Sequence, residues 1–125
     1  MTRLTCRAAF IILVASITLL SLVPPALRPV TAAPHSIEHL LIFAVTAAAM
    51  ALAFSWRWWA QAAGLALFAV AIETAQLFVP GRHARLSDLV VHLFGAGLGL
   101  AAVHVACRLN WPASRGDTGP SPTLR

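Results

Sequence analysis

Four long apolar segments, separated by short polar or proline-rich stretches, dominate this sequence of 125 residues. A helix that spans the hydrocarbon core of a bilayer needs about 20 mostly apolar residues, so four such helices would use about 80 residues. Hydrophobic residues make up 59% of the chain and charged residues only 10%. Soluble domains carry roughly 25% charged residues and cannot bury so much apolar surface. The sequence therefore predicts one all-α polytopic membrane domain, a bundle of four transmembrane helices.

Prolines, aromatic residues and charges mark the ends of the apolar segments. The predicted spans cover about residues 8–23, 37–54, 60–79 and 88–107. They form one membrane domain over 8–107, after a short N-terminus and before a disordered tail over 108–125. Ser87 or Asp88 is the expected N-cap of the last span, because short polar side chains accept hydrogen bonds from the first helical amides.

The first span has an alternative interpretation as a cleaved signal peptide. Arginines precede its apolar run, and Val30-Thr31-Ala32 offers a small-residue cleavage site. The run is long for such a peptide, and three further spans follow it. Both features favour retention of this segment as a membrane span.

Arginine supplies all the fixed positive charge, since the chain has nine Lys and Arg residues together and none is lysine. The arginines stand singly or in close pairs at the ends of apolar runs, so nucleic-acid binding is not expected. Six lie in the two termini and the tryptophan-rich loop, against three in the other two loops. The positive-inside rule then predicts that both termini lie in the cytoplasm and that loop 80–87 lies on the extracytoplasmic side of the inner membrane.

Alternation of four spans brings the start of the second, the end of the third and the start of the fourth to one side of the membrane. Glu73 and Gln76 are three residues apart, and each can face the same side of its helix. Asp88 and His92 are four residues apart on the next span. Ionisable groups inside a bilayer are costly unless they pair or face the bundle interior, which favours a functional site. The candidate binding residues are His39, Glu73, Gln76, Arg82, Asp88 and His92.

A purely structural interpretation of these residues stands beside the functional one. Glu73 and Arg82 could form an ion pair, and Gln76 could make a hydrogen bond between helices. Metal binding needs three or four convergent ligands, and no metal motif supports it, so neither a metal nor a cofactor is expected. Ser87 is the one candidate nucleophile at the cluster, and helix capping explains it equally well.

Small residues on the last span predict a packing surface. Gly95 and Gly99 are four residues apart, a spacing that lets another helix backbone approach closely. We expect this face to pack against a helix, and it is one place where a second copy or another membrane protein could dock.

The string Glu73-x-x-Gln76-x-Phe78-x-Pro80-Gly81-Arg82, continued by Ser87-Asp88 and then Gly95 and Gly99, resembles the VanZ-like family of small bacterial membrane proteins. The resemblance covers roughly residues 35–100, and His39 fits it at the opening of the second span. It implies importance for His39, Glu73, Gln76, Arg82 and Asp88. Through the founding member it also implies a link to lowered susceptibility to the glycopeptide teicoplanin.

Two positions depart from the pattern of this family. His92 stands where members usually have asparagine, which adds a titratable group. The Asp-Lys pair often found before the opening histidine is here His35-Ser36, so a charge pair is missing.

Three functions fit the cluster. The first is an envelope-related binding protein that recognises the polar head of a membrane lipid or lipid-linked glycan, with Arg82 and Arg85 on a phosphate. The second is an integral-membrane enzyme acting on such a lipid, with Glu73 or Asp88 as general base and His39 or His92 as acid. The third is proton-coupled or ion-coupled transport through Glu73 and His92, which is disfavoured because the polar residues gather on one side and form no path across.

Overall fold

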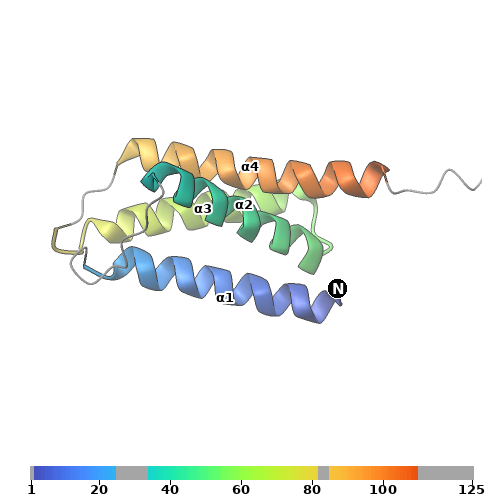
Figure 1. The fold of residues 1–125 in the computed structure, drawn as a ribbon, viewed down its shortest axis with the longest axis horizontal. Helices are drawn as coiled ribbons and strands as arrows, with labels where there is room; N and C mark the ends of the chain where they lie inside the picture. The colour runs from blue at the N-terminus through green and yellow to red at the C-terminus, as the bar shows by residue number, and fades with distance from the viewer. Residues whose placement is uncertain (1, 25–33, 82–84, 110–125) are drawn as a thin grey trace, which may run out of the picture.

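The computed structural model describes residues 2–24, 34–81 and 85–109. Within these ranges the chain forms four helices: α1 (Arg3–Leu22), α2 (His35–Ala53), α3 (Trp58–Gln76) and α4 (Leu86–Leu109). They lie side by side and run alternately in opposite directions (Figure 1). Each is long and apolar enough to cross a membrane. The chain is thus an all-α, multi-pass membrane protein, as the sequence predicts.

Local hydrogen bonds set the ends of the helices. α1 begins at Arg3 because the hydroxyl of Thr2 accepts a hydrogen bond from the amide of Thr5 at 3.3 Å. α3 ends at Gln76, and the turn that follows reaches Gly81, which has a positive φ of 78°. α4 begins at Leu86, earlier than the span predicted from residue 88. Ser87 and Asp88 therefore lie inside its first turn. Neither is the N-cap, the residue immediately before the helix, which the sequence predicts one of them to be.

The helix α2 contacts each of the other three helices, as α3 does, and it packs most extensively against α4. Glycines in α4 allow this approach. A Cβ atom on Gly99 would lie 2.9 Å from the carbonyl carbon of Ala44 and 2.9 Å from the Cβ atom of Ala47. A Cβ atom on Gly95 would lie 3.1 Å from the carbonyl carbon of Leu40. Neither position has room for a side chain.

This packing decides which surface of α4 is open to other molecules. Gly95 and Gly99 are buried against α2 of the same chain, so the face expected to receive a partner is already covered. An oligomer or a membrane partner stays a prediction. Gly97 between them has nothing within 4 Å of a Cβ atom.

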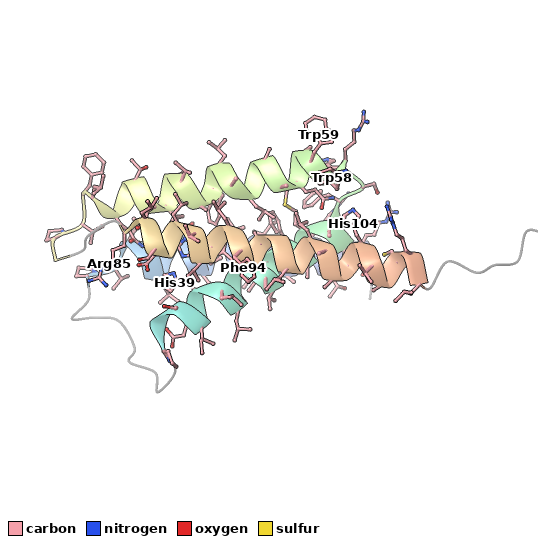
Figure 2. All side chains as sticks on the ribbon, turned by 90° about the horizontal axis from the view of Figure 1, so that it is seen from above. His39, Trp58, Trp59, Arg85, Phe94 and His104 are labelled. Carbon is pink, nitrogen blue, oxygen red and sulfur yellow. The ribbon has the colours of Figure 1, made fainter. Side chains whose placement is uncertain are left out.

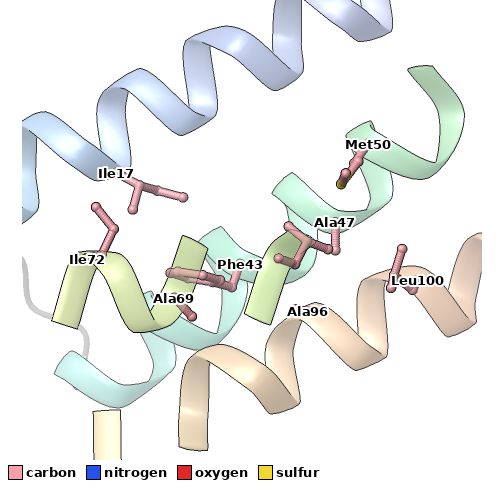
Figure 3. Packing of buried hydrophobic residues seen from close by; sticks show 9 residues of the cluster. Ile17, Phe43, Ala47, Met50, Ala69, Ile72, Ala96 and Leu100 are labelled. Carbon is pink, nitrogen blue, oxygen red and sulfur yellow. The ribbon is translucent and has the colours of Figure 1, made fainter. Parts of the chain in front are cut away.

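The apolar core lies between the four helices, and every helix contributes to it (Figure 3). Its buried members are Ile17, Phe43, Ala47, Met50, Leu65, Ala69, Ile72, Ala96 and Leu100. Large apolar side chains also cover the outside, where Ile11, Leu67 and Phe94 are 63%, 71% and 61% exposed. Lipid tails are as apolar as these side chains, so this surface suits a bilayer.

The two ends of the bundle differ in chemistry. Figure 2 shows His39 and Arg85 toward one end, and Trp58, Trp59 and His104 toward the other. Trp58 and Trp59 are 64% and 53% exposed, as expected for tryptophans at the level of the lipid headgroups. We call this the tryptophan end. We call the opposite end the polar end, where α2 begins, α3 ends and α4 begins.

Candidate functional site

Two buried histidines form a direct contact at the polar end. Nδ1 of His39 in α2 and Nε2 of His92 in α4 share a hydrogen bond. The two rings lie within 17° of parallel, with centroids 4.7 Å apart. His39 is 9% exposed and His92 is 1% exposed. A bond between two imidazole nitrogens needs one N–H group and one lone pair, so one ring donates the N–H proton and the other accepts it.

Backbone packing and a phenylalanine set the position of this histidine pair. Gly95 lies three residues after His92 in α4 and packs on Leu40, the neighbour of His39 in α2. This close approach brings the two imidazoles within reach of each other. The ring of Phe43, one helical turn after His39, stacks on His92 with centroids 4.1 Å apart and an angle of 16°. Phe43 is itself 1% exposed, so it holds the orientation of the His92 ring.

Glu73 connects the end of α3 to the start of α4. Its side chain is 7% exposed, and its Oε1 atom accepts a hydrogen bond from the main-chain amide of Arg85 at 2.5 Å. Its Oε2 atom is buried, and among the described residues it has no hydrogen-bond partner. The carboxylate therefore positions the first residues of α4 and keeps one acceptor oxygen for a further donor.

The remaining predicted residues lie around these two features. Gln76 follows Glu73 in α3 and is 4% exposed. Asp88 is half-buried in the first turn of α4, where the hydroxyl of Ser87 lies 3.3 Å from its Oδ1 atom and donates to it. Arg82 lies outside the described residues. The ion pair between Glu73 and Arg82 that the sequence suggests is therefore untested.

Five of the six candidate residues lie in the described part of the polar end: His39, Glu73, Gln76, Asp88 and His92. The structure brings His39 and His92 into direct contact. The assignment of these residues as a binding site stays a prediction.

One participant, Phe43, was missing from the sequence-based set, and a second, Arg85, takes part in a way that the sequence did not predict. Phe43 follows His39 by four residues, and this helical spacing indicates that both can lie on one face. The sequence suggested Arg85 for its guanidinium group, whereas the contact that the structure shows is from its main-chain amide to Glu73, which no side-chain pattern reports. Within the described ranges, no group of three or more His, Cys, Asp or Glu residues is placed to hold a metal ion.

Comparison with known proteins connects this geometry to a family. No curated protein sequence and no solved structure matches the chain. A family model described as VanZ/LLP1 matches residues 7–107, which include the histidine pair, Glu73 and the glycines that pack α4 on α2. Because this match covers most of the chain, the protein belongs to the VanZ/LLP1 family.

Proposed function

We infer that this membrane protein binds the phosphate-bearing head of a lipid or lipid-linked envelope precursor at its polar end. The observation that carries the inference is the burial of Glu73, whose Oε2 atom has no partner among the described residues. A buried polar atom without a hydrogen bond costs about 1–3 kcal/mol. Ionisable groups inside a membrane protein typically mark a functional site, because an apolar residue would avoid that cost.

The chemistry of the polar end suits a phosphate with neighbouring hydroxyl or amine groups. Arg85 is exposed beside the first turn of α4, and Arg82 precedes it by three residues in the sequence. Guanidinium groups bind phosphate oxygens through paired, charge-assisted hydrogen bonds. Glu73 holds the main chain of Arg85 and offers Oε2 to a donor on the ligand. Gln76 adds an amide that can donate and accept.

The test is the lipid that copurifies with the protein. We would purify the full chain, Arg82→Ala and Glu73→Gln from native membranes and compare their lipid extracts by mass spectrometry. Arg57→Ala is the matched control, because Arg57 is an exposed arginine at the tryptophan end that packs near Trp59. We expect one phosphate-bearing lipid class to disappear in the first two variants and to remain in the control.

Two other outcomes would contradict the proposal. Identical lipid extracts from all four proteins would show that the polar end does not select a lipid. A fall in the membrane level of Arg82→Ala and Glu73→Gln, with the lipid content of the remaining protein unchanged, would instead indicate a structural role for these residues.

A membrane enzyme is the second candidate, and the His39–His92 hydrogen bond is the observation that favours it. An imidazole pair can hold and transfer a proton, as a general acid does. Glu73 or Asp88 would act as the base. Turnover of a lipid-linked substrate by purified protein, lost in His39→Asn, would support catalysis over binding alone.

Transport has less support from the packing. Ala47, Met50 and Leu65 fill the bundle between the two ends and are at most 5% exposed. A proton path would have to cross this apolar layer. An envelope role and a link to teicoplanin susceptibility rest on the family resemblance, and deletion of the gene with measurement of glycopeptide sensitivity would test both.

A further inference from the structure

We propose that His39 and His92 form a single proton-binding site whose charge regulates anion binding at the polar end. The first half of this proposal depends only on the geometry of the pair. The second half rests on the proposed binding of a phosphate-bearing lipid head. The two halves are therefore tested separately.

Proton counting defines the charge states that the pair can adopt. When both imidazoles are neutral, each carries one N–H group, and one of these lies in the bond between Nδ1 of His39 and Nε2 of His92. One added proton gives an imidazole with an imidazolium, and the bond persists with a charge of +1. A second added proton would occupy the accepting lone pair and break the bond. While the helices stay packed, the pair carries a charge of 0 or +1.

The surroundings of the pair act on its positive state in opposite directions, because burial of both rings disfavours the charged form and the neighbouring Phe43 ring favours it. The face of Phe43 lies against the His92 ring at 4.1 Å, and an aromatic face attracts a cation. Besides the pair, the titratable and charged residues that the structure describes at this end are His35, Glu38, Glu73, Arg85 and Asp88. The ionisable residues of α1 are Arg3, Cys6 and Arg7, which lie at the start of this helix, away from the polar end.

The added charge would change the affinity for an anion. Histidine ordinarily changes its charge between about pH 5 and pH 8. In its positive state the pair would attract a phosphate bound by Arg85, which lies toward the same end of the bundle as His39. In its neutral state the pair would not exert this attraction. Binding of an anionic headgroup should therefore strengthen as the pH falls, by about threefold if the two charges interact through partly hydrated surroundings.

Nuclear magnetic resonance of the full chain, with its histidines labelled with nitrogen-15, tests the pair without any lipid. We expect a downfield imidazole proton that correlates with nitrogens of both His39 and His92. We also expect the two rings together to take up one proton, and not two, while the helices stay packed. His92→Asn should abolish the shared signal, while the amide still offers a donor and an acceptor to His39. Independent uptake of two protons by two rings would overturn the proposal.

Binding of phosphatidylglycerol, followed by native mass spectrometry at about pH 6 and about pH 8, tests the regulation. Phosphatidylcholine serves as the probe without net charge. We expect the wild-type chain to bind phosphatidylglycerol about threefold more tightly at the lower pH. The double variant His39→Asn/His92→Asn should bind it equally at both. The control His104→Asn removes a histidine at the tryptophan end, where Nδ1 bonds the carbonyl of Leu100, and should keep the wild-type dependence.

The outcomes separate the two proposals. Persistence of the pH dependence in the double variant would assign it to His35 or His83 and overturn the regulation. A shared proton in the resonance spectra, with no phosphatidylglycerol bound at either pH, would support the pair and overturn its role in lipid binding. If the wild-type chain and every variant bound phosphatidylglycerol and phosphatidylcholine equally, while the shared proton was observed, the proposed function would be contradicted and the histidine pair would be supported.

Discussion

Gly99 of α4 lies so close to the carbonyl group of Ala44 in α2 that no side chain fits between the two helices. The same is true of Gly95 and the carbonyl group of Leu40, next to His39. The α2–α4 interface therefore fixes the distance across which His39 and His92 meet. The contact between His39 and His92 therefore depends on the packing of Gly95 and Gly99 against α2.

Gly99→Ala should destabilise the bundle, because the new methyl group would overlap the backbone of α2. Overpacking of this kind costs about 1–3 kcal/mol. Thermal unfolding in detergent, followed by circular dichroism, measures the change. Gly97→Ala is the matched control, since nothing lies within 4 Å of a Cβ atom there. Equal unfolding temperatures for the two variants would contradict the close approach of α2 and α4.

Phe43→Ala should lower the free energy of unfolding by roughly 3 kcal/mol, because it removes a buried ring from the core. It should also free the His92 ring to rotate, which the histidine resonance spectra would report. Phe94→Ala removes the same group from an exposed position on α4, where the ring is 61% exposed. We expect that control to change the free energy of unfolding by less than about 0.5 kcal/mol. A similar loss in both variants would argue against the stacking.

Glu73→Leu should release the main-chain amide of Arg85, which loses its acceptor oxygen. Hydrogen exchange at that amide should accelerate about tenfold or more, as expected for a lost hydrogen bond. Glu73→Gln keeps a carbonyl oxygen in the same place and should preserve most of the protection. Thr74→Ala is the control, because the Thr74 hydroxyl bonds its own helix at Val70. Unchanged exchange in Glu73→Leu would rule out this connection between α3 and α4.

Labelling of native cysteines tests the orientation that the arginines predict. Cys107 is exposed near the end of α4, at the tryptophan end, while Cys6 is buried. If the termini are cytoplasmic, a membrane-impermeant maleimide should label Cys107 in inside-out vesicles and leave it unlabelled in right-side-out vesicles. Cys107→Ser should remove the signal, because Cys6 is only 5% exposed. The opposite pattern would invert the predicted topology.

The amino-acid sequence by itself determined the number of helices and which residues share an end of the bundle. Apolar length is set by the thickness of the bilayer, and alternation of spans follows from chain connectivity, so both can be read without coordinates. This is why His39, Glu73, Gln76, Asp88 and His92 could be grouped together before any packing was known.

Only the tertiary structure decided how each helix is rotated and which polar groups touch. Sequence spacing pairs Asp88 with His92 and Glu73 with Gln76, because residues three or four apart share a helix face. Packing adds the bonds from His39 to His92 and from Glu73 to the amide of Arg85. It also places Gly95 and Gly99 against α2 of the same chain, with no room left for a side chain at either position. Helical rotation depends on the summed fit of all side chains, and no local pattern in the sequence carries that information.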